Sequence, residues 1–265
     1  MATYTRVADP FAARASETSP SGVNDWGTVV GEYVTHGGLF PQSHGFVEIG
    51  GVYRTIDDPN AGFRGSDATA INNKGEIAGY FFDSNDISHG FVESDGKYHT
   101  LQGPPGAEST QATGINDKGE IVGLYWDNVS QSADSFAEIH GAYQTISDPL
   151  GANTDVAGVN DKGRIVGTYD NNSFNGFVEF EGSYHTIDDP LGADGTQLSG
   201  INNRGEIVGT YWDSGDVAHG FVESHGVYHT INDPQASLLG AYVSGVNDHR
   251  QLVGSDGAGG FIRTP

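Results

Sequence analysis

The sequence has 265 residues and a formal net charge of −23, from 12 Lys+Arg against 35 Asp+Glu. This charge disfavours sequence-independent binding to nucleic acid or to an anionic membrane surface, because both repel an acidic protein. Cysteine is absent, which excludes disulfides and thiolate metal sites. No apolar run approaches the roughly 20 residues that span a bilayer, and the first residues lack the basic and apolar segments of an export signal. We therefore expect no nucleic-acid partner and no membrane insertion.

A repeated unit runs through the whole sequence. Its consensus is G-[IV]-N-[DN]-x-G-x-[IV]-[VA]-G-x-Y, then H-G-F-V-E, then G-x-Y-x-T-I-x-D-P. The asparagine recurs at intervals of 48, 44, 44, 42 and 45 residues, at Asn24, Asn72, Asn116, Asn160, Asn202 and Asn247. The copies occupy approximately residues 16–56, 64–101, 109–146, 153–187, 196–231 and 240–264, the last together with 3–8. We expect all of them to form one domain, residues 1–265.

Each copy predicts four short strands, over the segment before the asparagine, E-I-V-G, H-G-F-V-E and Y-x-T-I. The N-[DN]-[KR]-G sequence between the first two indicates an Asx-turn and then a glycine with positive φ, so these strands form a tight hairpin. A second hairpin is expected at the glycines between the third and fourth strands, namely Gly51, Gly96, Gly141, Gly182 and Gly226. Helix should be nearly absent, because no segment keeps a 3.6-residue apolar period.

The two ends of the sequence predict how the repeats are joined. Residues 4–10 match a fourth strand such as residues 53–59, and the sequence finishes after the third strand that contains Phe261. The N-terminal segment is therefore expected to complete the last copy, which removes exposed sheet edges. Small residues before each asparagine fit an innermost strand where the copies converge: Gly22, Ala70, Gly114, Gly158, Gly200 and Gly245. The predicted fold is all-β, a six-bladed β-propeller with four antiparallel strands per blade, closed by the N-terminal strand.

The third strand carries a recurring triplet, at residues 44–46, 89–91 and 219–221, with sequence His-Gly-Phe. It resembles the His-Ala-Phe triplet of the extracellular HAF-repeat family, and the likeness covers almost the whole sequence. The histidine is replaced at Asp134, Asn175 and Gly259, so it is not a fixed requirement. The resemblance implies a secreted or cell-surface repeat protein, and it carries no agreed activity. Because His44, His89 and His219 lie in separate copies, we expect structural hydrogen bonds to neighbouring loops rather than a shared site.

In a propeller, alternate connections lie at opposite ends of the ring. The fourth-to-first and second-to-third connections share one end, which we name the acidic rim because most aspartates fall in them. The tight turns share the other end, the turn rim, which receives Lys74, Lys118, Lys162, Arg204 and Arg250. The aspartates of the repeated x-D-P are expected to start turns: Asp9, Asp58, Asp148, Asp189 and Asp233.

Two pairs of carboxylates on the acidic rim are candidate Ca²⁺ ligands, Asp83 with Asp86 and Asp213 with Asp216. Carboxylates separated by two turn residues can share a calcium ion, although the full ligand pattern of a calcium loop is missing here. We therefore expect no obligatory cofactor, with Ca²⁺ as the one candidate.

Aromatic residues end the second strands at the acidic rim, at Tyr33, Phe81, Tyr125, Tyr169 and Tyr211, and a second aromatic follows at Phe82, Trp126 and Trp212. We expect the first set in the core, because strand alternation turns the following residue to the other side. An aromatic face beside an aspartate suits a sugar ring or a small aromatic ligand. The candidate ligand-binding residues are Trp126, Asp127, Trp212, Asp213, Tyr33, Phe82, Asp83 and Asp170.

Catalytic motifs are not evident, since there is no G-x-S-x-G elbow, no cysteine and no phosphate-binding glycine loop. We favour a monomeric ligand-binding or display module, for glycans or small molecules, whose repeated sites gain by avidity. The alternative is a hydrolase, lyase or cyclase that uses the central pocket, and an asymmetric site would then lie where the repeat breaks, at residues 34–43, 102–105 and 255–259. A self-assembling surface or structural protein is the third reading.

Overall fold

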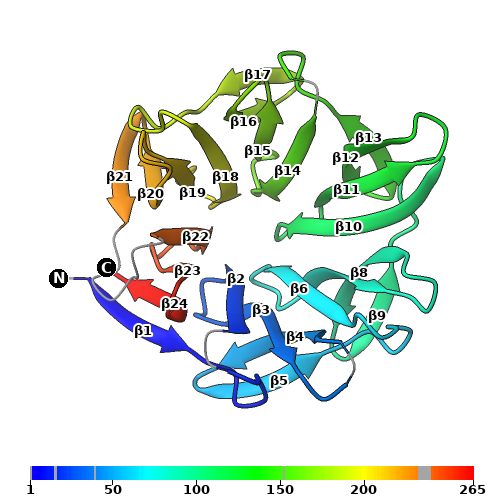
Figure 1. Ribbon diagram of the computed structural model, residues 1–265. Coiled ribbons are helices and arrows are strands. Elements are labelled where there is room, and N and C mark those ends of the chain that lie inside the picture. The colour runs from blue at the N-terminus through cyan, green and yellow to red at the C-terminus, as the bar shows by residue number, and fades with distance from the viewer. Residues whose placement is uncertain (1, 15–16, 39, 152, 232–239) are drawn as a thin grey trace.

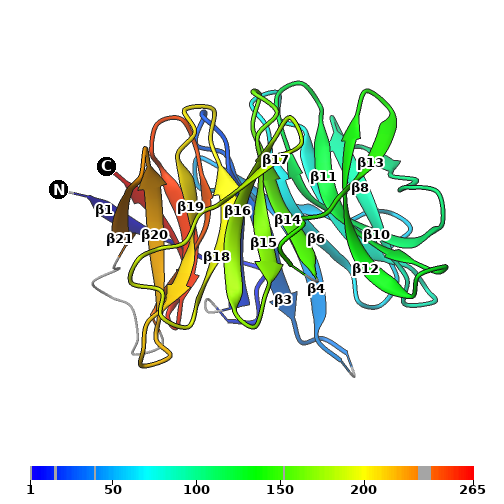
Figure 2. The same cartoon turned by 90° about the horizontal axis from the view of Figure 1, so that it is seen from above.

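The computed structural model describes residues 2–14, 17–38, 40–151, 153–231 and 240–265. These residues form 24 strands and no α-helix, which confirms the prediction that helix is nearly absent. None of their elements is a helix long and apolar enough to cross a membrane. Four-stranded units are arranged around a central axis (Figure 1), and the side view shows their loops gathered at two opposite ends (Figure 2).

The strands repeat in four positions. The innermost position holds β2 (Thr18–Val23), β6 (Ser66–Ile71), β10 (Ala107–Ile115), β14 (Thr154–Val159), β18 (Gly195–Ile201) and β22 (Ala241–Val246). The second holds β3 (Val29–Thr35), β7 (Ile77–Phe82), β11 (Ile121–Asp127), β15 (Ile165–Asp170), β19 (Ile207–Trp212) and β23 (Leu252–Asp256). The third holds β4 (Gln42–Ile49), β8 (Ser88–Ser94), β12 (Ser132–Ile139), β16 (Phe174–Phe180), β20 (Ala218–Ser224) and β24 (Gly259–Thr264). The outermost holds β5 (Val52–Ile56), β9 (Lys97–Thr100), β13 (Ala142–Ile146), β17 (Ser183–Thr186), β21 (Val227–Ile231) and β1 (Thr3–Val7).

Within each unit the strands pair antiparallel in the order innermost, second, third, outermost. The units of β14–β17 and β18–β21 are additionally joined by one parallel bridge, between Phe174 and Gly195. As predicted, the N-terminal strand belongs to the last unit, because β1 pairs antiparallel with β24 and sets Arg6 opposite Phe261. Strands from the two ends of the chain therefore share one sheet.

The tight turns between innermost and second strands follow the predicted chemistry. In the first unit, Oδ1 of Asn24 accepts the N–H groups of Trp26, at 3.1 Å, and Thr28, at 3.0 Å. Gly27 then takes φ +76°, which costs a glycine little. The last turn differs, because Arg250 takes the corresponding position with φ +61°.

Each of these asparagines also binds the next unit. The Nδ2 group of Asn24 donates to the backbone oxygen of Asn72 at 3.2 Å. The same contact links every later asparagine to its successor, and Asn247 donates back to Asn24 at 2.8 Å. A second set of hydrogen bonds joins the residues that directly follow these asparagines. In each unit the backbone N–H of this residue donates to the side chain of its counterpart in the next unit, and the N–H of Asp248 in the last unit donates to Asp25 in the first. The turn rim is thus held by two circuits of hydrogen bonds around the axis.

The core repeats as well. The phenylalanine of each third strand is fully buried, at Phe46, Phe91, Phe136, Phe177, Phe221 and Phe261. Its ring packs on the glycine of the second strand, where a Cβ on Gly79 would come 2.8 Å from Phe91 Cζ. The innermost strands approach as closely as predicted, since a Cβ on Gly114 would lie 2.9 Å from the Cα of Gly158. Bulky residues are therefore excluded at both positions.

The glutamate of H-G-F-V-E has a structural role that the sequence did not reveal. Its carboxylate accepts the N–H of the glycine three residues later, as in Glu93 to Gly96 at 2.6 Å. Glu48, Glu138, Glu179 and Glu223 make the equivalent bond. The glutamate therefore caps the turn into the outermost strand. The last unit takes its outermost strand from the N-terminus, and the residue at this position is Arg263.

Candidate functional site on the acidic rim

Large aromatic side chains are exposed on the acidic rim. Trp126, near the end of β11, is 38% exposed. Phe174, at the start of β16, is 46% exposed, and its ring centroid lies 6.3 Å from that of Trp212 on β19 in the neighbouring unit. Phe40 and Phe63 lie 6.5 Å apart and line an open depression of about 460 Å³. Separate loops of different units thus present apolar faces to solvent on one side of the protein.

Trp126 is exposed because its neighbours in the sheet are small. It lies opposite Ser109 on β10 and Ala133 on β12. The adjoining Asp127 accepts the N–H of Val129 at 2.6 Å, and this bond lowers the pKa of its carboxyl. A partly exposed indole and, one residue later in the chain, an ionised acceptor therefore lie at this end of β11.

The second predicted tryptophan is less accessible. Trp212 is half-buried, and Phe174 covers part of its ring from the neighbouring unit. Its companion Asp213 accepts the N–H groups of Gly215 and Val217 and contacts His219 Nε2 at 3.0 Å. The histidine contact, followed by these backbone bonds, lowers the pKa of Asp213.

Tyr33 requires a correction. It was predicted both as a core residue and as a ligand contact, and only the core position holds, because its side chain is 4% exposed. Its hydroxyl bonds Thr55 Oγ1 at 2.9 Å, and its ring stacks on His44 at 5.1 Å. Equivalent aromatics of the other units are buried in the same way, at Phe81, Tyr125, Tyr169 and Tyr211.

One face of the Phe82 ring is covered by Arg64. The guanidinium of Arg64 lies 3.6 Å above the centre of its ring. Asp170, at the end of β15, is half-buried, and its N–H donates to the backbone oxygen of Asn153 at 3.0 Å. Asp233, also expected on this rim, lies outside the described residues.

The triplet histidines make structural contacts, as predicted. His44 Nδ1 contacts Asp57 Oδ2 at 2.7 Å, and its Nε2 contacts Thr35 Oγ1 at 3.2 Å. His89 and His219 each contact the aspartate six residues earlier through Nε2. The x-D-P aspartates also start turns: Asp58 Oδ1 accepts the N–H of Asn60 at 2.8 Å.

The candidate calcium ligands have protein partners. Asp83 Oδ1 accepts the N–H groups of Asn85 and Ile87, and the bond from Ile87 is the main cause of its lowered pKa. Asp86 pairs instead with Arg64 at 3.1 Å. Among the described residues, no three His, Cys, Asp or Glu side chains come close enough to hold one metal ion. A calcium ion here would have at most two protein carboxylates.

Sequence reasoning missed a carboxyl pair between the first two units. Glu32 on β3 hydrogen-bonds Asp67 on β6, and the Ser43 hydroxyl contacts both carboxyls, Glu32 Oε2 at 3.0 Å. Burial, followed by the negative charge of Asp67, raises the pKa of Glu32 to about 7. Tyr80 also bonds Asp67, and burial raises its pKa. One signal was present: Glu32 is the single acid at its repeat position, where later copies have Tyr80, Leu124, Thr168, Thr210 and Ser255.

The central channel offers little room. A cavity of about 70 Å³ lies within the ring of asparagines at the turn rim. A second cavity of about 90 Å³ is lined by the innermost strands, with Ser21, Thr69 and Thr113 among its residues. Binding pockets for small molecules usually enclose about 300 Å³ or more, so these two cavities suit a few waters rather than a sugar ring.

Comparison of the sequence with protein families and with curated proteins gave no match. Solved structures of similar fold include TolB from Acinetobacter baumannii, with 12% identity over 91% of this chain and a TM-score of 0.59; the chain spans 64% of TolB. A gluconolactonase from Xanthomonas campestris matches with 15% identity, 94% and 86% coverage of the two chains and a TM-score of 0.54. The fucose-recognising lectin of Aleuria aurantia, a six-bladed β-propeller, matches with 13% identity, 90% and 87% coverage and a TM-score of 0.53.

These likenesses, together with the four-stranded units, define the class of the protein as a β-propeller. At such low identity they concern the fold alone, because propellers host binding proteins and enzymes alike. The neighbours include a lectin and a lactonase, so function must be argued from the residues of this chain.

Proposed function

We propose that this protein is a ligand-binding module that takes up glycans on its acidic rim. The observation that carries the proposal is the partly exposed indole of Trp126, which the ionised Asp127 follows in the chain. A sugar presents apolar C–H faces and hydroxyl groups, and this pair supplies a flat apolar surface and an acceptor for those two features.

Further contacts of the same chemistry lie around the rim. The Phe174–Trp212 pair stands between two units beside Asp213, and the Phe40–Phe63 depression lies between two others. An exposed aromatic contributes on the order of 1 kcal/mol beyond its buried area, so each site alone would be weak. Several weak sites on one rigid face gain affinity for a branched or surface-bound glycan through effective concentration.

The overall architecture that we propose is a six-bladed propeller closed by β1. Its support is the pairing of β1 with β24 and the circuit of asparagine bonds that returns from Asn247 to Asn24. We further propose a monomer of the extracellular HAF-repeat family, on the strength of the His-Gly-Phe triplets.

Glycan-array binding of the wild type and of Trp126→Ala and Trp212→Ala tests the proposed function. Trp26→Ala is the matched control, because Trp26 is the remaining tryptophan, is 79% exposed and lies on the turn rim. We expect binding to fall at least tenfold in Trp126→Ala, less in Trp212→Ala, and not at all in Trp26→Ala. Equal binding in all four proteins would contradict the proposal.

The Glu32–Asp67 pair favours a second candidate, an enzyme that uses a protonated and an ionised carboxyl together. Such a directly bonded pair is suited to activating a water for hydrolysis of a lactone or an ester, and it is too close for glycoside hydrolysis, whose two carboxyls lie about 5 Å or more apart. Screening of aldonolactones and nitrophenyl esters with the wild type, Glu32→Gln and Asp67→Asn tests this candidate. Turnover that persists in both variants, or no turnover by the wild type, would rule out this enzyme function.

A further inference from the structure

Two departures from the repeat meet in one cleft on the turn rim. The left-handed position of the tight turn is glycine in the other five copies, at Gly27, Gly75, Gly119, Gly163 and Gly205, and is Arg250 in the last. The turn-capping glutamate of five copies is Arg263 in the last. The last unit has no turn from its third to its outermost strand, so it needs no glutamate to cap one. The absence of this turn does not explain why the residue is an arginine. Both changes add a guanidinium at the same place.

The cleft lies between the outer strands of the unit β18–β21 and the unit that contains β22–β24. It has a volume of about 430 Å³, which is in the range of small-molecule sites. Its apolar lining includes Val222, Ile231 and Leu252, and His229, Arg250 and Arg263 line the same space. The combination is an apolar pocket with cationic side chains in its wall.

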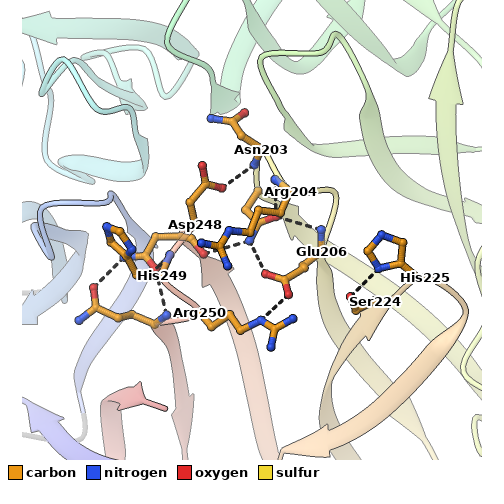
Figure 3. A network of polar contacts seen from close by, with 11 residues as sticks. Asn203, Arg204, Glu206, Ser224, His225, Asp248, His249 and Arg250 are labelled. Carbon is orange, nitrogen blue, oxygen red and sulfur yellow. Dashed lines mark hydrogen bonds and ion pairs between the residues drawn. The ribbon is translucent and has the colours of Figure 1, made fainter.

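The one acidic residue that lines the cleft is already neutralised. Glu206 is buried, and its Oε1 accepts from Arg250 Nε at 2.5 Å (Figure 3). Its Oε2 accepts from Asn202 Nδ2 at 2.8 Å. Among the described residues, Arg263 has no acidic partner within ion-pair distance. The side chains that line the cleft therefore carry one more positive than negative charge, from Arg250 and Arg263 against Glu206, on a protein whose formal charge is −23.

The neighbouring cleft does not have this excess of positive side chains. The equivalent cleft one unit earlier has about 490 Å³ and is lined by Arg164 and Arg204, but also by Glu181 and Glu223. Between the first two units, Arg54 approaches Glu93 at 3.7 Å. Of the two clefts, only the one with Arg263 has lost the third-strand glutamate, so its side chains favour an anion more than those of its neighbour.

We propose that this cleft binds a small organic anion, a carboxylate attached to an aromatic or branched apolar body. The carboxylate would pair with Arg263 and the free edge of Arg250, since a guanidinium presents donors in a geometry that matches a carboxylate. The apolar body would lie against Val222, Ile231 and Leu252. The site is independent of the acidic rim, because it lies on the opposite end of the ring.

Titration calorimetry and ligand-observed NMR with benzoate, phenylacetate and cyclohexanecarboxylate test the proposal, with benzamide as the neutral control. We expect saturable binding of at least one carboxylate, weakened at least tenfold by Arg263→Gln, and at least tenfold weaker binding of benzamide. Arg263→Glu restores the residue of the other copies and should abolish binding. Arg204→Gln, a matched change in the neighbouring cleft, should leave the affinity unchanged.

Each variant is first compared with the wild type by thermal melting, so that loss of fold is distinguished from loss of charge. Binding unchanged in Arg263→Glu, equal affinity for benzamide, or no saturable binding of any of the three carboxylates to the folded wild type at millimolar concentration would overturn the proposal.

Discussion

Asn247 donates a hydrogen bond from Nδ2 to the backbone oxygen of Asn24 at 2.8 Å, although 223 residues separate them in the chain. The same side chain bonds Gln251 Oε1 at 2.7 Å, and its Oδ1 accepts the N–H groups of His249 and Gln251. One buried amide therefore shapes the last turn and joins the last unit to the first.

Substitution of Asn247 by alanine should destabilise the protein by about 2–3 kcal/mol, because several buried groups lose their partners at once. For a domain of this size the melting temperature should fall by roughly 2–4 °C for each kcal/mol. Calorimetry of Asn247→Ala measures the effect, and Asn171→Ala, at an exposed loop position, is the control. A melting temperature equal to that of the control would show that the contact between the ends is unimportant.

Removal of residues 1–10 should lower stability by several kcal/mol and promote aggregation, because it exposes the edge of β24. The deletion removes Val7, whose side chain is 2% exposed, and the ion pair of Arg6 Nη1 with Asp256 at 3.0 Å. Light scattering and thermal melting measure both effects, and a deletion of residues 1–2 alone is the control. A monomer that melts like the control would contradict the structural role of β1.

The repeat made most of the fold predictable. Each turn is determined by local chemistry, such as the asparagine that accepts two nearby N–H groups and the glycine that follows, so strands and hairpins could be placed from the sequence. The joining of β1 to β24 was predictable because residues 4–10 match a fourth strand. The exposed side of Trp126 also followed from alternation along β11.

Other features depend on contacts between units, which a repeat pattern does not reveal. The Glu32–Asp67 pair requires two neighbouring units and Ser43 to meet in space. The covering of Phe82 by Arg64 likewise arises from a loop that folds back over β7. Tyr33 was assigned to a ligand site because it ends a strand on the rim, but the stacked His44 and the bond to Thr55 place it in the core.

Calcium should raise the melting temperature only slightly, and only at low ionic strength. The reason is that one oxygen of Asp83 and one of Asp213 are already engaged by backbone N–H groups. Calorimetry with Ca²⁺ and with a chelator measures the shift. Asp83→Asn retains an oxygen that can accept both loop bonds while removing the charge, and should reduce the response. Melting temperatures indifferent to both calcium and chelator would remove metal from the account of this rim.

The carboxyl pair predicts how stability changes with pH. Burial and the neighbouring Asp67 raise the pKa of Glu32 from its ordinary 4.5 to about 7, so between these values the folded protein holds a proton that the unfolded chain has released. Unfolding then releases a proton, and the stability contributed by this group is present below about pH 4.5 and lost as the pH rises to about 7. A rise of one in a pKa corresponds to about 1.4 kcal/mol of free energy. Because solvent near the pair weakens the effect, we expect the free energy of unfolding to fall by about 2 kcal/mol over this pH range.

Glu32→Gln removes this titration while keeping a side chain of similar shape. Its stability relative to the wild type should therefore rise by about 2 kcal/mol between pH 5 and pH 8, because only the wild type must ionise a carboxyl beside Asp67. Denaturant unfolding at the two pH values measures the difference, and Glu181→Gln, on the exposed turn into β17, provides the control. The comparison with the wild type cancels other titrating groups, such as Asp9 and Asp189, whose pKa values burial also raises. A difference between Glu32→Gln and wild type that does not change with pH would show that Glu32 is ionised throughout, and the acid–base pair would then be absent.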